Sequence, residues 1–392
     1  MIETKIPSRI NGLDTLRAAA IILTFMYHYM VFVSHSDTFG IGSRIGWVGV
    51  DLFFVLSGYL IGNQILSAIK TGRDFSLRIF YIRRFLRTLP NYYIVLALYF
   101  LFPLVMGGST PPPLWRFLTF TQNIGLQLGT AFSHAWSLCI EEQFYLILPA
   151  VALLVAGCRK SVRLGWALIA LMILAGMLSR GLLWREYGSD PQGYYTHIYY
   201  SSFCRFDELL PGVAIAMLKN FHGNVWEHLQ KRSSLVFVGS VLAVALTFYL
   251  FLNFHFYDAQ GYSFFMTVFG YPMLAMSFAM LTISALSPAS FLYKVRVPGA
   301  SSLALWSYAI YLTHKPLFTI AKAPLSKLDI GADSITGVVT MICISIAGGW
   351  LLYRLVETPF MRLRDRLYKT NSTSHAATGK SADIKQLHGE SA

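Results

Sequence analysis

An apolar stretch near the start of the chain carries two side chains that could do chemistry. The sequence LDTLRAAAIILTFMYHYMVFV, residues 13–33, is long enough to cross a bilayer, yet it holds Arg17 and His28. Eleven helical positions come close to three full turns, so both side chains share one face, about 16 Å apart along the axis. A cation at one end and an imidazole deeper in the span would suit anion binding and general-base catalysis on one elongated ligand. The alternative is an arginine that reaches the interface and a structural histidine bonded to a neighbouring helix.

A second basic group follows in the sequence RIFYIRRFLRTLP. Arg84 and Arg87 lie three positions apart, and the planar guanidinium group binds phosphate oxygens in pairs. This pattern is compatible with an anion-binding site at the inner mouth of a membrane bundle. The alternative is the ordinary excess of basic residues on the inner side of a membrane, with contacts to anionic membrane lipid.

Carboxylates inside apolar segments form a third group. Asp51 lies in GWVGVDLFFVLSGYLIG, and Glu141 and Glu142 lie in HAWSLCIEEQFYLILP. Ionisable groups at membrane depth are costly and usually face a polar interior, so the adjacent carboxylates indicate a functional site unless an Arg or His pairs with them. Ser57 is followed by a glycine, which permits close helix packing or close approach of a ligand to the backbone.

Further polar and aromatic residues are expected on the outer side of the bundle, where they could bind a second substrate. They are Trp47, His134, Trp136, Arg205, Asp207 and His314. Two alternatives remain open at this stage. Arg205 and Asp207 could simply neutralise each other, and aromatic residues are common at membrane interfaces for reasons unrelated to binding.

A membrane scaffold must position these side chains. Of the 392 residues, 55% are hydrophobic and 13% are charged, whereas soluble domains carry roughly 25% charged residues. The predicted fold class is therefore all-α, a polytopic membrane helix bundle of about ten transmembrane helices. The expected helices lie near residues 13–34, 46–69, 89–107, 135–156, 164–183, 203–219, 234–253, 263–287, 300–321 and 335–356. The segment 112–133, rich in Pro and Gly, is expected to be an outer loop or a re-entrant piece.

Basic residues set the predicted orientation. With both termini cytoplasmic, the inner loops and the near tail hold about 20 Lys and Arg and the outer loops about five, as the positive-inside rule requires. Topology thus explains much of the net charge of +13, and no nucleic acid is expected as a partner. Residues 1–369 are predicted to form one transmembrane domain, and residues 370–392 a disordered cytoplasmic tail.

The remaining patterns narrow the class of protein. The four cysteines, Cys139, Cys158, Cys204 and Cys343, lack metal-ligand spacing, so we predict buried free thiols and no metal site. No internal repeat is visible, which gives little support to an inverted-repeat transporter. A transporter or flippase of a glycan or small molecule nevertheless remains the alternative function.

In their order and spacing, these motifs resemble the acyltransferase-3 family of integral membrane acyltransferases, many of which are polysaccharide O-acetyltransferases. The resemblance rests on Arg17 and His28 with ten residues between them, on FFVLSG, on Arg84-x-x-Arg87, on WSLCIEEQFYL, on SYAIYLTH and on ETP. It extends from about residue 11 to residue 360, nearly the whole transmembrane region.

The resemblance implies transfer of an acyl group, acetyl by default, from cytoplasmic acetyl-CoA to a hydroxyl of an extracytoplasmic or lipid-linked saccharide. The host membrane would be the cytoplasmic (inner) membrane of a bacterium. Arg17, Arg84 and Arg87 would hold the CoA phosphates, Ser57 would let the ligand approach, and the pantetheine arm would extend toward His28. His28 would then take the proton of the acceptor hydroxyl, or accept the acyl group itself.

The roles of the other residues stay open at this stage. Asp51, Glu141 or Glu142 would orient His28 or bind the sugar. Aromatic residues near the outer face could stack on a sugar: Trp47, Tyr194, Tyr195, Tyr199 and Tyr200. The acceptor, the length of the acyl chain and the oligomeric state cannot be read from the sequence.

Overall fold

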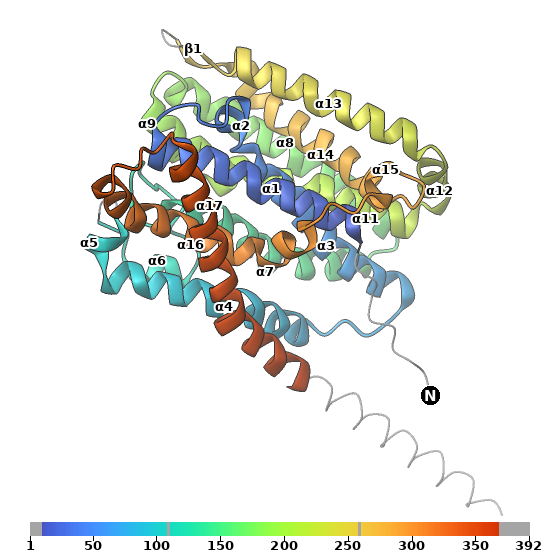
Figure 1. Ribbon diagram of the computed structural model, residues 1–392. Helices are drawn as coiled ribbons and strands as arrows, with labels where there is room; N and C mark the ends of the chain where they lie inside the picture. Colours follow the sequence, from blue (N-terminus) through green and yellow to red (C-terminus); the bar gives the residue numbers. More distant parts are fainter. Residues whose placement is uncertain (1–9, 108–109, 258–259, 368–392) are drawn as a thin grey trace, which may run out of the picture.

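The chain folds into a bundle of long helices (Figure 1). The computed structural model describes residues 10–107, 110–257 and 260–367. The long helices are α1 (Asn11–Tyr29), α3 (Val48–Thr71), α4 (Leu77–Leu101), α7 (Trp136–Ala156), α8 (Ser161–Tyr187), α11 (Leu210–Phe221), α13 (Ser233–Phe254), α14 (Tyr271–Leu286), α16 (Ala300–Lys327) and α17 (Ile335–Leu352). The predicted tail, residues 370–392, lies outside the described residues.

Short elements connect the long helices. They are α2 (Ile41–Ile45), α5 (Pro103–Met106), α6 (Leu114–Leu118), α9 (Pro191–Tyr194), α10 (Ser202–Arg205), α12 (Gly223–Lys231), α15 (Phe291–Lys294), 3-10 turns at Ser133–Ala135 and Phe206–Leu209, and π-helical turns at Met30–Ser34, Tyr195–Tyr199, Met266–Gly270 and Tyr353–Glu357. Two short strands, β1 (Phe256–Tyr257) and β2 (Gly261–Tyr262), pair antiparallel.

The all-α membrane fold is confirmed, but the count of ten transmembrane helices is not. Every predicted range overlaps a helix, and seven helices of the described residues are long and apolar enough to cross a membrane. α4, α11 and α16 are not among those seven. The predicted helix 203–219 is broken into α10, a 3-10 turn and α11, which has only 12 residues. Segment 112–133 holds the short α6 and the first residue of the 3-10 turn at Ser133–Ala135, and its other residues are non-helical.

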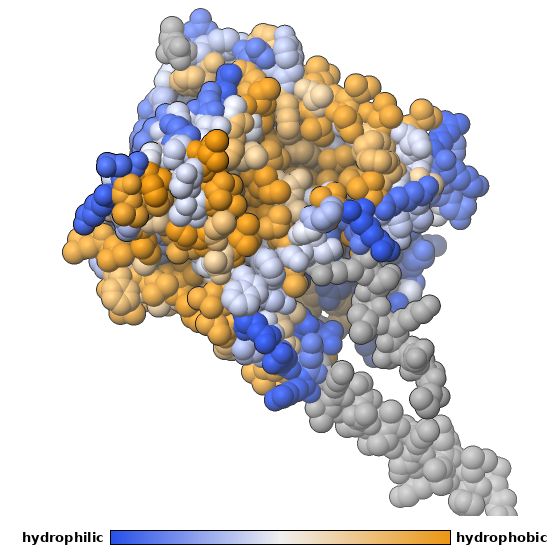
Figure 2. All heavy atoms as spheres, in the orientation of Figure 1, coloured by the Kyte–Doolittle hydropathy of each residue, from blue (hydrophilic) through white to orange (hydrophobic). Residues whose placement is uncertain are grey.

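The surface of the bundle has the hydropathy pattern of a membrane protein. Figure 2 shows a broad hydrophobic zone over the middle of one face, with hydrophilic residues gathered toward its ends. The exposed apolar side chains include Leu174 and Leu178 of α8 and Leu242 and Leu246 of α13. Such side chains suit hydrocarbon rather than water, so these helices face lipid.

The helix that carries Arg17 and His28 lies inside the bundle. α1 packs against α3, α14 and α16, and α3 packs in turn against α7 and α11. This central position explains why α1 can keep ionisable side chains, because they face protein rather than lipid.

Gly58 and Gly212 bring α3 and α11 into close contact. A Cβ atom on Gly58 would lie 1.9 Å from the carbonyl oxygen of Leu209, and one on Gly212 would lie 2.1 Å from that of Val55. No side chain other than hydrogen fits between backbones at these distances. The Ser-Gly pair of the FFVLSG motif therefore serves helix packing at its glycine.

Replacement of Gly58 by alanine is expected to lower stability by about 1–3 kcal/mol, because the added methyl group would overlap the backbone of Leu209. Thermal unfolding of the purified protein in detergent would measure this loss. Gly223→Ala is the matched control, since nothing lies within 4 Å of a Cβ there. Equal melting temperatures for the two variants would contradict the close packing.

The cysteines agree only in part with the sequence prediction. All four are free, and Cys139 and Cys204 are buried. Cys158 and Cys343 are exposed, so the prediction that they are buried is wrong. Cys343 lies in the apolar α17, where surrounding hydrocarbon rather than the protein interior accounts for the apolar sequence, and Cys158 lies in the turn between α7 and α8.

Candidate active site

An arginine–carboxylate cluster lies between α3, α4 and α7. The hydroxyl groups of Ser57 and Tyr145 donate hydrogen bonds to the two oxygens of Glu141, at 3.1 and 3.0 Å. The guanidinium of Arg84 lies 3.6 Å from the centre of the Tyr145 ring, and its Nε lies 3.7 Å from Oε1 of Glu142. With Arg17 of α1, which interacts electrostatically with Arg84, Tyr145 and Glu141, these residues form what we call the arginine–carboxylate cluster.

The arginines of this region are suited to an anionic ligand. Arg87 interacts electrostatically with Arg17, Arg84 and Glu357, so all three predicted phosphate-binding arginines lie together. The buried Nε atoms of Arg17 and Arg84 have no hydrogen-bond partner among the described residues. Buried polar groups are normally hydrogen-bonded, and guanidinium groups bind anionic oxygens strongly. The geometry is therefore suited to an anionic group such as a phosphate.

A histidine cluster lies further along α1. Nδ1 of His28 lies 2.6 Å from Nε2 of His314, and the two rings are nearly parallel, with 8° between their planes. The ring of His134 lies 6.3 Å from that of His28 and 5.5 Å from that of His314. We call these three residues the histidine cluster. The described residues contain no group of three or more His, Cys, Asp and Glu that could hold a metal ion.

The hydrogen bonds of this cluster fix which nitrogen of His28 can act as a base. Nδ1 of His314 lies 2.9 Å from the carbonyl oxygen of Ile310, which can only accept, so Nδ1 of His314 is the donor. Nε2 of a neutral His314 then accepts the proton on Nδ1 of His28. This assignment leaves Nε2 of His28 with a free lone pair, as a general base requires.

His134 faces the same space with its polar atoms unused. It is only 3% exposed, and neither ring nitrogen has a hydrogen-bond partner among the described residues. Its backbone is fixed by the hydroxyl of Tyr311, which donates to the His134 carbonyl oxygen. A buried imidazole without partners has the capacity to bind a polar group of a ligand.

A row of side chains on α16 lies between the two clusters. Tyr308, Tyr311 and His314 follow one another at intervals of three residues, so each lies beside the one before it and the row winds about 120° around the helix. The hydroxyl of Tyr308 donates to the carbonyl of Thr88, which follows the arginines of α4. The rise from Tyr308 to His314 is about 9 Å. Polar groups thus extend from the arginines to the histidines through the interior of the bundle.

Comparison with known proteins places the chain in a family. The model of a family described as an acyltransferase domain matches residues 10–354, nearly the whole described structure. The chain belongs to the acyltransferase-3 family. This confirms the resemblance read from the motifs, and the similarity of the chain to named O-acetyltransferases supports acyltransferase activity.

Several relatives share this family domain. The chain is 29% identical over 373 residues to "Peptidoglycan O-acetyltransferase OatA" of Listeria monocytogenes, covering 90% of this chain and 56% of that protein. It is 29% identical over 371 residues to "Putative peptidoglycan O-acetyltransferase YrhL" of Bacillus subtilis, covering 89% and 54%. A putative O-acetyltransferase of Staphylococcus aureus is 25% identical over 375 residues, covering 90% and 57%. The chain thus spans about half the length of these relatives. No solved structure matches it.

Asp51 is paired with an arginine and not with His28, the imidazole that it was predicted to orient. Its Oδ1 accepts a hydrogen bond of 2.8 Å from Arg205, which also contacts Glu208 at 2.5 and 3.1 Å. The side chains of these three residues are completely buried. We call them the buried ion triad. Nδ1 of His28 is bonded instead to His314, and Glu141 and Glu142 belong to the arginine–carboxylate cluster, so none of the predicted carboxylates occupies that position.

The suggestion that Arg205 and Asp207 neutralise each other is also wrong. Asp207 forms a two-pronged ion pair with Arg180 of α8, with both distances 2.8 Å. A Cβ atom on Gly176 would lie 2.6 Å from the carboxyl carbon of Asp207, so this glycine makes room for the pair. Both aspartate and arginine are at most 2% exposed. Their contacts support a structural role rather than the predicted binding of an acceptor.

The predicted aromatic sugar site is mostly filled by protein. Trp47 packs against Tyr199, Phe251, His255 and Tyr271. Trp136 is 4% exposed and lies beside the guanidinium of the buried ion triad. Tyr194, Tyr199 and Tyr200 are buried as well, whereas Tyr195 is partly exposed and bonds to Tyr27 at 3.4 Å. Trp47 and Tyr195 are the partly exposed members of this group.

Three buried charged residues were missed by the sequence reasoning: Arg180, Glu208 and Lys315. Arg180 interrupts a strongly apolar span, which is itself a signal of a buried ion pair. Glu208 stands next to Asp207 in CRFDELLPG, and Lys315 directly follows His314 in SYAIYLTHKP. Their positions inside predicted spans could have revealed all three.

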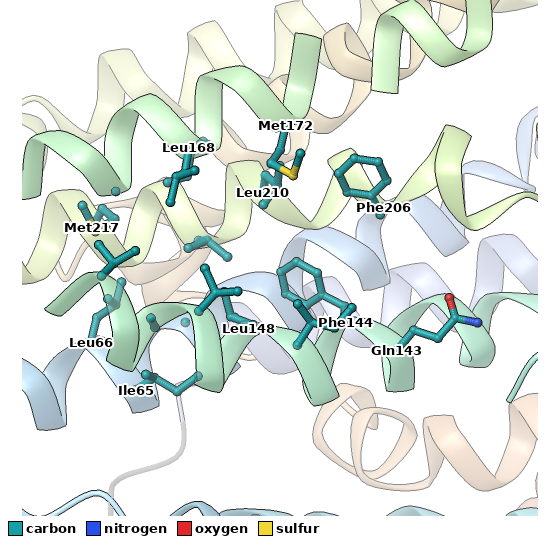
Figure 3. Close-up of a pocket in the computed structure, with 18 of the residues that line it drawn as sticks. Ile65, Leu66, Gln143, Phe144, Leu148, Leu168, Met172, Phe206, Leu210 and Met217 are labelled. Atoms are coloured by element: carbon teal, nitrogen blue, oxygen red, sulfur yellow. The ribbon is translucent and has the colours of Figure 1, made fainter. Parts of the chain in front are cut away.

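An apolar groove lies apart from both clusters. It has a volume of about 640 Å³ and is lined by residues of α3, α7, α8 and α11, among them Leu66, Leu148 and Leu168 (Figure 3). Gln143 is a polar residue of its lining, and its side chain is bonded to Phe120 and Ser202 at 2.6 Å each. With its polar groups already satisfied, the groove offers hydrocarbon contacts and no reactive group.

Proposed function

We propose that this protein transfers an acyl group, acetyl in the simplest case, from acyl-CoA at the cytoplasmic face to a hydroxyl group of a saccharide at the outer face of a bacterial cytoplasmic membrane. The observation that carries this proposal is a series of polar side chains that leads from Arg17 and Arg84, past Tyr308 of α16, to His28 and His314. Family membership and the names of the relatives support the same reaction. Peptidoglycan is the acceptor favoured by those names.

The donor would lie along this path. Arg17, Arg84 and Arg87 carry the positive charge that phosphate groups need, and two of their Nε atoms make no hydrogen bond within the described part of the chain. Arg17 and His28 are separated by about 16 Å along one helix face. A long donor with phosphates at one end and a thioester at the other could therefore reach both groups at once.

The chemistry then follows from the free lone pair of His28. Nε2 of His28 accepts the proton of the acceptor hydroxyl while that oxygen attacks the thioester carbon. The carbon–sulfur bond breaks, the thiolate leaves, and the proton on Nε2 passes to the sulfur. The products are a saccharide ester and the CoA thiol. Throughout the reaction, Nδ1–H of His28 donates to Nε2 of His314. Nε2 of His314 remains the acceptor because Nδ1–H of His314 donates to the Ile310 carbonyl oxygen.

A test with two separated compartments addresses this proposal. The purified protein would be reconstituted in vesicles, with acetyl-CoA on one side and soluble peptidoglycan fragments on the other. We expect acetyl ester on the fragments and an equal amount of free thiol on the donor side. The thiol should appear only when the acceptor is present, because the acceptor oxygen displaces it.

Two other results would contradict the proposal. Movement of intact acetyl-CoA or intact fragments across the membrane without ester formation would support the transporter alternative. Ester formation only when both substrates are on the same side would contradict the arrangement along the bundle. Vesicles with no protein measure spontaneous thioester hydrolysis and leakage.

A further inference from the structure

Lys315 is a buried cation inside the catalytic region that the proposed reaction does not use. It is 7% exposed, and its Nζ donates a hydrogen bond of 3.0 Å to Ser133 Oγ. The same Nζ lies 4.5 Å from the centre of the Phe32 ring. The Phe32 ring is also 5.4 Å from that of His28, so the ammonium lies close to the histidine cluster.

Within the described residues, no carboxylate forms an ion pair with Lys315. The ion pairs of the described residues lie elsewhere, and none includes this lysine. The charged or titratable groups that interact with it are the imidazoles of His28, His134 and His314, and a neutral imidazole carries no negative charge. An ammonium has three donors, and the described contacts use one N–H and one cation–π contact. A buried charge of this kind is costly unless an anion pairs with it.

The position of Lys315 indicates which substrate supplies that anion. Phe32 follows His28 by four residues, so it lies about 6 Å further toward the outer face. Ser133 immediately precedes α7 at the outer end of that helix. Lys315 therefore lies on the outer side of the histidine cluster, whereas the arginines that fit the donor phosphates lie on the inner side. The substrate that reaches Lys315 from outside is the acceptor.

We propose that Lys315 binds a carboxylate of the acceptor, so that the preferred substrate is an acidic saccharide. This inference rests on the proposed acyl transfer. The unpartnered ring nitrogens of His134 lie next to Ser133 in the sequence and offer further hydrogen bonds to the same sugar. Binding of the carboxylate neutralises the buried ammonium and places the acceptor hydroxyl beside Nε2 of His28.

Pairs of acceptors that differ only in charge test this assignment. N-acetylmuramic acid and its amide form one pair, and methyl glucuronide and its amide form the other. Within each pair the hydroxyl groups are the same, so any preference reports the carboxylate. With the full-length protein in vesicles, we expect kcat/KM to favour the acid about 10- to 100-fold, as for a hydrogen bond to a charged group.

Three variants assign that preference to Lys315. Lys315→Met should reduce the ratio of acid to amide to about 1, mainly through KM, while Lys315→Arg should keep a part of it. If Lys315→Met does not fold, Ser133→Ala is the alternative test. It removes only the hydroxyl that holds the ammonium, and it should reduce the ratio of acid to amide about 3- to 10-fold. Lys322→Met, at an exposed position of the same helix, is the matched control and should keep the wild-type ratio.

The outcomes separate this inference from the reaction itself. Transfer to acid and amide at equal rates by the wild type would overturn the inference and leave the acyl transfer standing. An equal fall in kcat for both members of a pair in Lys315→Met would also overturn it, since Lys315 would then stabilise the oxyanion of the reacting thioester. Absence of ester with every acceptor, together with no release of thiol, would overturn the proposed function.

Discussion

Replacement of His28 by alanine is expected to lower acyl transfer by about 10²- to 10⁴-fold, the range that removal of a general base produces. The free alcohol of a saccharide is a poor nucleophile, and Nε2 of His28 is the lone pair that the tautomers leave available. Labelled acetyl-CoA would be supplied to membranes that contain wild type or variant at matched expression. The incorporation of label into surface carbohydrate would be measured.

Two further variants make this result specific. His228→Ala, at an exposed position of α12, should behave like the wild type and controls for the loss of any histidine. His314→Ala should lower the rate less than His28→Ala, because it removes only the group that fixes the imidazole. Equal incorporation by wild type and His28→Ala would contradict the assignment of the base and leave membership in the acyltransferase-3 family unaffected.

The parts of the site that depend on one helix could be predicted from the sequence. The common face of Arg17 and His28 follows from a spacing of eleven residues, and the structure places those side chains in two polar clusters along α1. The Ser-Gly pair of α3 was expected to allow close packing, and Gly58 contacts the backbone of Leu209. Such inferences need only the period of the helix.

The parts that depend on partners from distant helices could not be predicted. The sequence showed ionisable residues at similar depth, and several pairings between them were possible. Asp51 could have assisted His28, yet its partner is Arg205, 154 positions away. The His28–His314 bond joins residues 286 positions apart. The depth of a residue in the membrane can be read from hydropathy. The rotation of each helix about its axis, and the helices it packs against, depend on packing between helices.

The irregular chain around α10 shows a second limit. A continuous helix was predicted for 203–219, because apolar residues dominate that range. The structure instead has a 3-10 turn at Phe206–Leu209, which directs Asp207 toward Arg180 and Glu208 toward Arg205. The helix is broken where these two buried ion pairs form, and hydrophobic periodicity carries no information about such pairs.

Replacement of Arg205 by methionine is expected to destabilise the protein by about 3–5 kcal/mol, the usual loss when one partner of a buried ion pair is removed. Asp51 and Glu208 would remain buried side by side without their cation. The aromatic rings of Tyr199 and Tyr271, 4.6 and 4.3 Å from the guanidinium, would also lose their contact with it. Thermal unfolding in detergent and the yield of folded protein would measure the effect.

Comparison with two other variants decides between a structural role and the acceptor-binding role predicted for Arg205. Arg185→Met, at an exposed position of α8, should change stability by less than about 0.5 kcal/mol. Arg205→Met combined with Asp51→Asn and Glu208→Gln should recover much of the lost stability, because no unpaired carboxylate remains. A single variant that melts like the wild type but has lost transfer would show that Arg205 acts on the substrate. If Arg205→Met is less stable and the triple variant regains that stability, the buried ion triad has a structural role. It would then hold α3 to the chain that precedes α11. Because α3 carries Ser57, the triad would also support the arginine–carboxylate cluster.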